Sequence, residues 1–412
     1  IQKFDYKTDP LLGEVEGSIL WHDENPAADA KNGLQLSSLR GLEYDDPVWD
    51  VLLDNLDYES KDIPELLTHG LYQTAAVESI GKVETSDHDG TVGLTATWGG
   101  NNELAAMMGT TSNPVTACGY PCGSVQAATW NRELMEAMGA MVGAESLTNN
   151  LSGWYAPGLN LHRTPYSGRS FEYYSEDPLL TGHIASAVVS GAFTNGGLTT
   201  YLKHFVLNET DENRDAVAIW VDEQTFRQLY LKAFELCVKN AKGTEKYYDS
   251  GLGEIAEKEV KACRGIMTSM NFVGAESPTN SYTLLTTLLR GEWGFVGMAL
   301  TDFTWGPYKS TDVGYRIGND IWMAMEAAEL DLSTPTAKWC ARNAVHNIAY
   351  VVVNSNAYNN VPPGAYAYYD ISPWKVSLIT ADVIVGVICL AAVALVLFRQ
   401  RDEKRHPEKY KR

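Results

Sequence analysis

Two stretches of the chain hold the residue types that could recognise a sugar. Residues 153–178 read Gly-Trp-Tyr-Ala-Pro-Gly-Leu-Asn-Leu-His-Arg-Thr-Pro-Tyr-Ser-Gly-Arg-Ser-Phe-Glu-Tyr-Tyr-Ser-Glu-Asp-Pro, and an apolar run then leads to Lys203, His204 and Phe205. Aromatic rings can stack on the apolar faces of a sugar ring, while Arg, Lys, His and carboxylates make the charge-assisted hydrogen bonds that hydroxyl groups require. This combination favours a hydrolase that binds carbohydrate.

Such side chains need strands to position them. Three short β-rich runs, Leu198–Val206, Gly265–Met270 and Gly297–Thr301, carry or precede a polar group, namely Lys203-His204, Asn271 and Asp302. Helix-like segments alternate with these runs, and the clearest opens at Asp222, a good N-cap. The alternation predicts an α/β fold, a (β/α)8 TIM-type barrel with its chemistry at the C-terminal ends of the strands. Periodicity alone leaves a doubly wound sheet open.

Composition narrows the class of protein. The 412 residues are 45% hydrophobic and carry a formal net charge of -20, which predicts one large domain with appendages and argues against a nucleic-acid partner. The main effect expected of a net negative charge is to keep the protein soluble. Six cysteines are too few for a disulfide scaffold, and whether Cys118 and Cys122 form a bridge stays open. The scattered histidines support no metal site, and we expect neither metal nor cofactor.

The C-terminal part predicts a membrane anchor. Residues 376–398 are apolar apart from Ser377, Thr380 and Asp382, and a helix of this length spans roughly 34 Å, enough for a hydrocarbon core of about 30 Å. Basic residues dominate the tail at 399–412, which the positive-inside rule keeps in the cytoplasm. We therefore expect a single-pass protein of the cell membrane with an extracellular barrel. A buried core helix is the alternative.

Several motifs, in order along the chain, resemble family 3 glycoside hydrolases of the β-glucosidase type. They cover about three-quarters of the chain, and the stretches that carry the resemblance are Leu67-Thr68-His69-Gly70, Asp89-Gly90-Thr91-Val92-Gly93, Thr129-Trp130-Asn131, the long signature at 153–178, Lys203-His204-Phe205, Asn213-Arg214, Asp222-Glu223, Glu292-Trp293-Gly294-Phe295 and Leu300-Thr301-Asp302-Phe303. The resemblance implies a barrel domain at 47–355, a linker at 356–375, and a remnant of an upstream region at 1–46.

The resemblance also assigns roles to individual residues. Asp302 matches the catalytic nucleophile, which in a retaining glycosidase attacks the anomeric carbon. An N-cap aspartate is the alternative for this position. The substrate-binding positions that it implies are Asp89, Arg163, Arg169, Lys203, His204 and Met270. Ion pairs with Glu172, Glu176 and Asp177 are the structural alternative for part of this set, and we interpret Trp154 and Tyr155 as core residues.

The sequence departs from the family pattern in three places. Thr91 replaces a usual proline, which is expected to loosen the turn that presents Asp89. Met270 stands where many members have a tyrosine that hydrogen-bonds the nucleophile. The general acid/base of two-domain members lies on an α/β-sandwich domain outside the barrel, and the loop at 206–210 lacks the histidine that barrel-only members use. We expect the acid/base upstream of Ile1, as in members whose domains are in inverted order.

These inferences predict an exo-acting retaining β-glycosidase, foremost a β-glucosidase acting on β-glycosides or oligosaccharides. A β-xylosidase is an alternative, since the pocket near Asp89 is what separates hexose from pentose. A surface carbohydrate-binding pseudoenzyme is another, given the unassigned acid and the changes at Thr91 and Met270.

Overall fold

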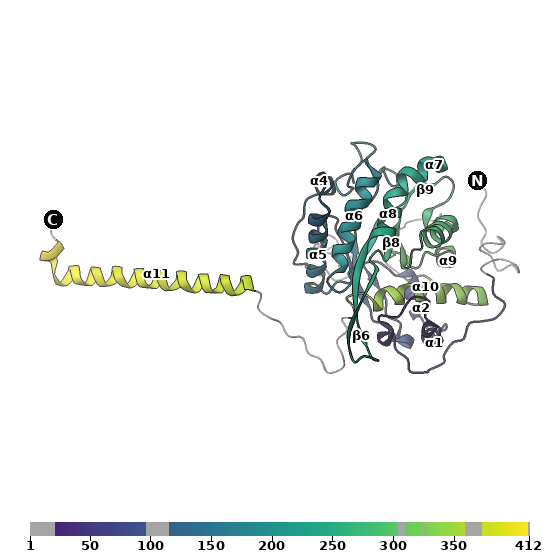
Figure 1. The fold of residues 1–412 in the computed structure, drawn as a ribbon, viewed down its shortest axis with the longest axis horizontal. Coiled ribbons are helices and arrows are strands. Elements are labelled where there is room, and N and C mark those ends of the chain that lie inside the picture. The colour runs from purple at the N-terminus through teal and green to yellow at the C-terminus, as the bar shows by residue number, and fades with distance from the viewer. Residues whose placement is uncertain (1–20, 96–114, 304–309, 325–326, 359–372, 411–412) are drawn as a thin grey trace. The chain divides into compact units, whose positions relative to one another are not determined.

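The computed structural model describes residues 21–95, 115–303, 310–324, 327–358 and 373–410. The chain divides into two compact units, one up to Asn360 and one from Val361 onward. The first unit contains a curled sheet surrounded by helices (Figure 1). The linker predicted at 356–375 lies mostly outside the described residues, and the domain boundaries stay predictions.

The central sheet of the first unit has six strands in the order β1-β2-β3-β4-β8-β10. All neighbours are parallel except β1 and β2. The strands are β1 (Gln73–Thr74), β2 (Thr85–Asp89), β3 (Gly153–Tyr155), β4 (Thr199–Phe205), β8 (Gly265–Thr268) and β10 (Met298–Thr301). The α/β class is thus confirmed, with parallel strands whose carboxyl ends share one edge.

Residues 321–322 connect the two outer strands of this sheet, β10 and β1. Leu300 of β10 forms a parallel bridge to Ile321. The next residue, Trp322, donates its N–H to Leu67 O at 2.8 Å and accepts from Gly70 N at 2.9 Å, just ahead of β1. A Cβ at Gly70 would lie 2.1 Å from Ile321 Cγ2, so the approach needs a glycine. The sheet therefore curls towards a barrel, with six strands in the described ranges.

Helices and short helical turns cover the outside of the sheet. They include α1 (Val48–Leu53), α2 (Asp62–Thr68), α4 (Gly123–Ala128), α5 (Arg132–Thr148), α6 (Pro178–Phe193), α7 (Glu223–Thr225), α8 (Lys232–Asn240), α9 (Thr311–Arg316), α10 (Pro335–Val353), the 3-10 turns η1 (Leu36–Leu39), η2 (Glu78–Ile80) and η5 (Pro278–Asn280), and the π turns η4 (Phe226–Tyr230) and η6 (Thr283–Glu292). Two apolar clusters result. One joins α5, α6 and α8 to β4, and the other joins α2 and α10 to β10.

The sequence predictions for local structure are confirmed where the structure tests them. The three predicted runs contain β4, β8 and β10. Asp222 caps α7, since its Oδ1 accepts from Thr225 N at 2.9 Å, although a π turn then separates α7 from α8. Asp177 caps α6 by accepting from Leu179 N at 2.7 Å. Trp154 and Tyr155 are each 1% exposed and belong to the core.

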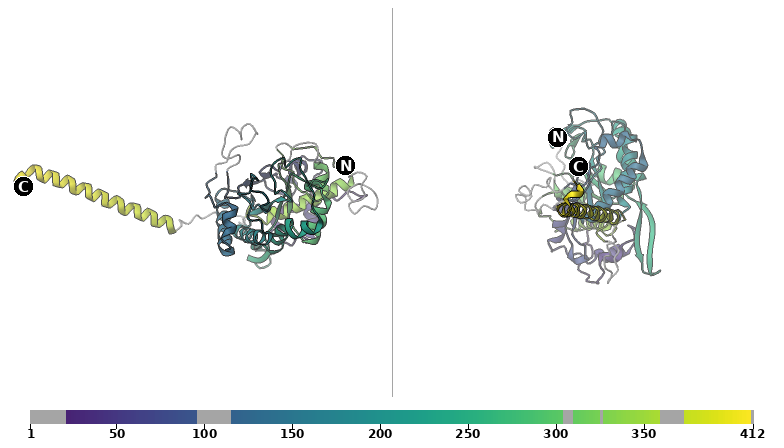
Figure 2. Two further views of the ribbon diagram at one scale, coloured as in Figure 1. Left: turned by 90° about the horizontal axis from the view of Figure 1, so that it is seen from above. Right: turned by 90° about the vertical axis from the view of Figure 1, so that its left-hand side faces the viewer.

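One feature that the sequence analysis did not anticipate is a long hairpin. Strands β6 (Lys242–Asp249) and β7 (Glu254–Lys261) pair antiparallel over eight residues each and project from the body of the first unit (Figure 2). Its base is held by the buried ion pair between Arg264 and Glu245, at 2.6 Å. A second short sheet pairs β5 (Ala218–Ile219) with β9 (Phe272–Val273).

The second unit contains helix α11 (Pro373–Arg405), followed by the 3-10 turn η7 (Pro407–Tyr410). The helix is continuous through the apolar run predicted at 376–398 and extends into the basic tail. Its most apolar 18 residues have a mean hydropathy of 2.8. Of the helices in the described ranges, it is the one long and apolar enough to cross a membrane.

Candidate active site

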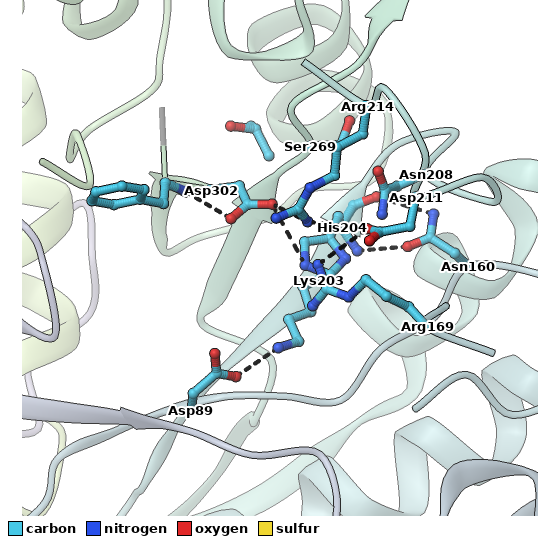
Figure 3. Close-up of polar contacts among 12 residues, drawn as sticks. Asp89, Asn160, Arg169, Lys203, His204, Asn208, Asp211, Arg214, Ser269 and Asp302 are labelled. Atoms are coloured by element: carbon cyan, nitrogen blue, oxygen red, sulfur yellow. Dashed lines mark hydrogen bonds and ion pairs between the residues drawn. The ribbon is translucent and has the colours of Figure 1, made fainter. Parts of the chain in front are cut away.

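Lys203, near the end of β4, is the centre of one half of the site. Its side chain is 2% exposed, and its Nζ lies 2.7 Å from Asp89 Oδ1 and 3.5 Å from Glu172 Oε2 (Figure 3). Burying an ammonium group is costly unless carboxylates compensate the charge, and two do so here. The contact with Glu172 is one of the ion pairs named as the structural alternative for this set, and the pairing of Lys203 with Asp89 was not predicted from the sequence.

Asp89 occupies the last position of β2 and is held by its own turn. Its Oδ1 also accepts from Gly90 N at 2.8 Å, and its main-chain oxygen accepts from Thr95 N at 3.0 Å. Burial alone would raise the pKa of Asp89, but the charge and hydrogen bond of Lys203, with the N–H of Gly90, hold that pKa below its usual value. The carboxylate is 43% exposed and so combines a fixed negative charge with access to a ligand.

Thr91 ties this turn to the rest of the site. Its hydroxyl donates to Glu172 Oε2 at 3.3 Å, and the indole of Trp154 donates to Gly90 O at 2.6 Å. A proline at position 91 could not make the first of these bonds, because it has no hydroxyl. We therefore find that the departure from the family pattern at Thr91 comes with an added contact.

Arg169 and Glu172 come from the loop between β3 and α6. The Arg169 Nε donates to Glu172 Oε1, and the same guanidinium lies 3.8 Å from Asp211 Oδ1. Glu172 thus accepts from Arg169 on one oxygen and faces Lys203 with the other. The signature segment supplies alternating charges that neutralise one another within the pocket wall.

Asp302 defines the other half of the site, immediately after β10. Its N–H donates to Thr268 O at 2.9 Å, which continues the pairing of β10 with β8. Its Oδ1 accepts from Phe303 N at 2.7 Å, and its Oδ2 lies 3.1 Å from Arg214 Nη1. The side chain is 10% exposed. A guanidinium and a backbone N–H thus hold this carboxyl group in one orientation, which a nucleophile requires.

His204 lies between the two halves, with its Nε2 3.7 Å from Asp302 Oδ2. Burial lowers the pKa of His204 well below its usual value, and the nearby charges of Arg169, Lys203 and Arg214 lower it further. Burial and these three cations thus favour the neutral form of the imidazole. Its main chain is clamped by Asn160, whose Oδ1 accepts from His204 N at 2.8 Å and whose Nδ2 donates to His204 O at 3.2 Å.

A cavity of about 310 Å³ opens beside the Asp89 half. Its walls carry charge of both signs together with aromatic rings, and the lining residues are Tyr72, Asp89, Gly90, Thr91, Val92, Thr95, Arg169, Phe171, Glu172 and Lys203. A cavity with ionised groups and ring faces at one end of a parallel sheet can bind a polyhydroxy ring.

The structure brings five of the seven predicted site residues together, and the other two lie in different surroundings. Asp89, Arg169, Lys203, His204 and Asp302 form the cluster of Figure 3. Arg163 is exposed, with its guanidinium carbon 5.1 Å from the centre of the Tyr230 ring. Met270 is 2% exposed and follows β8. Sugar-binding roles for these two residues stay predictions.

Sequence reasoning overlooked two polar members of the cluster. Arg214 pairs with Asp302, and Asp211 lies 3.4 Å from Arg214 as well as near Arg169. The motif Asn213-Arg214 was visible in the chain, but the partner of its arginine was not, because 88 positions separate Arg214 from Asp302. The loop that follows β4 returns these groups to the edge of the sheet.

Comparison with known proteins finds similarity to β-glucosidases. Residues 76–245 match the glycosyl hydrolase family 3 N-terminal domain. Beta-glucosidase A from Butyrivibrio fibrisolvens is 36% identical over 212 residues, 51% of this chain and 22% of that protein. A beta-glucosidase from Rhizobium radiobacter is 32% identical over 274 residues, 66% of this chain and 29% of that protein. The matched region thus spans less than a third of either relative.

Solved structures give the same result. Beta-glucosidase 3B from Thermotoga neapolitana, solved with glucose, aligns with a TM-score of 0.61 and 26% identity, over 76% of this chain and 43% of the other. The beta-glucosidase of Kluyveromyces marxianus, also solved with glucose, aligns with a TM-score of 0.62 and 26% identity, over 80% and 37%. The fold is thus similar to that of solved β-glucosidases.

Proposed function

We propose that the chain is a member of glycosyl hydrolase family 3 and provides the TIM-type barrel of a retaining, exo-acting β-glucosidase. The observation that carries the proposal is the position of Asp302 at the end of β10, with one oxygen 3.1 Å from Arg214 and the cavity of Asp89 and Lys203 in the same strand-end cluster. The similarity to β-glucosidases supports glucose as the sugar that is removed.

The proposed reaction has two steps. Asp302 Oδ2 forms a bond to the anomeric carbon as the bond to the leaving oxygen breaks, and the electron pair of that bond stays on the leaving group. Water then attacks the glycosyl-enzyme, releases the sugar with its original configuration and frees the carboxylate. Asp89, Lys203 and Arg169 hold the hydroxyls of the sugar during both steps, each charge-assisted bond contributing about 1.5 to 3 kcal/mol.

A general acid must protonate an alkoxide leaving group and later activate the water. We propose that this group lies on an α/β-sandwich domain outside residues 1–412, because the loop after β4 carries no histidine that could serve. Aryl glucosides with leaving groups of low pKa depart without a proton, whereas cellobiose needs one. The chain alone should therefore cleave a dinitrophenyl glucoside about 10² to 10⁴ times better, relative to the complete protein, than it cleaves cellobiose.

We also propose that α11 anchors the enzyme in the cell membrane, with the barrel outside and the basic tail inside. The support is the length and apolarity of α11 and the Lys and Arg residues beyond 398. Protease added to intact cells should remove the barrel and spare the tail. If the barrel were protected from the protease, the proposed topology would be wrong, and the enzymatic proposal would be unaffected.

A mechanism-based label tests the enzymatic proposal directly. A 2-fluoro glucoside with a good leaving group should form a stable glycosyl ester, and peptide mapping should locate it on Asp302. The matched control is Asp312→Asn, an aspartate on α9 that pairs with Arg316 and should leave labelling unchanged. A label on another carboxylate would refute Asp302 as nucleophile, and glucose binding without any labelling would favour a carbohydrate-binding protein.

A further inference from the structure

Behind His204 lies a buried hydrogen-bond group that the proposed reaction does not use. The hydroxyl of Tyr173 is 3.2 Å from His204 Nδ1, and Asn208 Nδ2 donates to the same hydroxyl at 3.0 Å. The Tyr173 oxygen also lies 3.3 Å from Asn208 O. Tyr173 is 1% exposed and Asn208 0% exposed, so both side chains are closed off from the surface. Among the described residues Asn208 Oδ1 has no hydrogen-bond partner, and the pairing in this group is that of the Tyr173 hydroxyl with His204 and Asn208.

A tyrosine hydroxyl has one proton, so it donates either to His204 or to Asn208 O. Burial raises the pKa of Tyr173 far above its usual value, which keeps that proton in place. The neutral imidazole of His204 also has one proton, on Nδ1 or on Nε2. If Tyr173 donates to Nδ1, the imidazole proton must be on Nε2. If Tyr173 donates to Asn208, the imidazole proton is on Nδ1.

Asp302 distinguishes these two arrangements. Its Oδ2 is 3.7 Å from His204 Nε2 in a site that is largely closed to water. An N–H directed at a carboxylate is attractive, whereas an unprotonated nitrogen directed at it is repulsive, and low polarity strengthens both effects. The negative charge of Asp302 thus favours the proton on Nε2, with Tyr173 donating to Nδ1.

We propose that Tyr173, supported by Asn208, is a positioning residue that holds neutral His204 as its Nε2–H tautomer facing the nucleophile. In this form His204 is a hydrogen-bond donor at the site, to Asp302 or to a sugar hydroxyl, and it is not a base. The consequence for catalysis rests on the proposed function. The assignment of the tautomer is independent of that function, because it is argued from contacts within the chain.

The backbone keeps the Tyr173 ring in place. Gly158 forms parallel bridges both to Tyr173 and to Lys203, so the three segments lie side by side. A Cβ at Gly158 would be 2.8 Å from Tyr173 Cδ1, which means the ring packs directly on this glycine. The ring planes of Tyr173 and His204 meet at 78°, with centroids 6.3 Å apart. Such packing leaves the hydroxyl little freedom to seek another partner.

Nitrogen NMR of the imidazole tests the proposal without requiring activity. The full chain of residues 1–412, labelled with ¹⁵N-histidine and kept in detergent micelles, gives signals that separate protonated from unprotonated ring nitrogens. His204→Gln identifies the signals of His204. We expect an unprotonated, hydrogen-bonded Nδ1 and a protonated Nε2 in the unsubstituted chain. The opposite tautomer would overturn the proposal, and this measurement needs no variant of Tyr173.

The variant Tyr173→Phe removes the donor and keeps the ring. The Nδ1 signal should move towards that of a nitrogen without a hydrogen bond, while Tyr174→Phe, a change at the adjacent buried tyrosine, should leave it in place. An unchanged Nδ1 signal in Tyr173→Phe would also overturn the proposal. On a dinitrophenyl glucoside, kcat/KM should fall about tenfold in Tyr173→Phe, the scale of one hydrogen bond. If the chain proves inactive, the proposed function fails and the NMR result still decides the tautomer.

Discussion

The carboxylates of Asp89 and Asp302 both stand at the carboxyl ends of parallel strands, yet their surroundings differ. Asp89 is 43% exposed and pairs with a buried ammonium, whereas Asp302 is 10% exposed and pairs with a guanidinium that is itself 25% exposed. The accessible carboxylate suits binding of hydroxyls, and the enclosed one suits attack on a single carbon. Asp89 and Asp302 therefore share their position at a strand end. They differ in the cation that each one pairs with and in solvent exposure, and these differences match their two proposed roles.

The largest effect on turnover is expected when the charge of Asp302 is removed. Asp302→Asn removes the attacking charge and keeps the shape, so turnover of an activated aryl glucoside should fall by about 10⁴ or more. Glucose affinity, measured by calorimetry, should change only a few-fold because Asp89 and Lys203 remain. A variant that kept substantial turnover would mean that the two carboxylates have been given the wrong roles.

Asp89→Asn should give the complementary result. The pocket loses a charge-assisted acceptor and Lys203 loses its nearest counterion, so kcat/KM should fall by about 10³, mainly through weaker binding. Steady-state kinetics separates the two cases: KM rises for Asp89→Asn, while kcat falls for Asp302→Asn. An unchanged KM would remove Asp89 from the sugar pocket.

Glu209 extends the comparison to a carboxyl group held by uncharged donors. It is 6% exposed, accepts from Leu161 N at 3.2 Å and from Asn160 Nδ2 at 3.4 Å, and burial raises its pKa from 4.5 to about 7. Between these values the folded chain holds a proton that the unfolded chain releases. The stability associated with this proton is thus complete below pH 4.5 and is lost as pH rises to about 7.

Glu209→Gln should remove this loss, because a glutamine oxygen can accept the same two hydrogen bonds and has no titrating proton. At pH 8 the variant should be more stable than the unsubstituted chain by on the order of 3 kcal/mol at most, and at pH 4 the two should be alike. Denaturant unfolding at the two pH values measures the difference. Glu212→Gln, at an exposed position in the same segment, is the control. Equal stabilities at pH 8 would contradict the buried, protonated carboxyl.

Arg163 should show the smallest effect. Its guanidinium lies over the Tyr230 ring and its side chain is exposed, so Arg163→Ala should change kcat/KM by less than about threefold, in line with a weak exposed cation–π contact. Arg169→Ala is the matched comparison and should cost far more, since it leaves Glu172 without its nearest partner. A large loss in Arg163→Ala would restore the sugar-binding role that its motif predicts.

Much of the site was predictable because its residues belong to contiguous motifs at the ends of recognisable strands. Lys203, His204 and Asp302 lie in or directly after an apolar β-rich run, whereas Asp89 ends the polar strand β2 and was found by its motif alone. The parallel sheet brings such strand ends together. Arg214 and Tyr173 escaped assignment because their importance depends on what lies opposite them. The β6–β7 hairpin was also missed, since its alternating charged residues show no sign of where its partner surface lies.

The sequence by itself determined the resemblance to family 3 glycoside hydrolases, the α/β class, the apolar C-terminal helix and the identities of the charged groups at the strand ends. These depend on local order along the chain: motif spacing, apolar runs and capping residues such as Asp177 and Asp222. Only the tertiary structure decided which cation pairs with which carboxylate, that His204 is buried beside three cations, and that Tyr173 faces its Nδ1. Pairing and burial join residues that are distant in the chain, and electrostatic energies depend on those distances and on the exclusion of water.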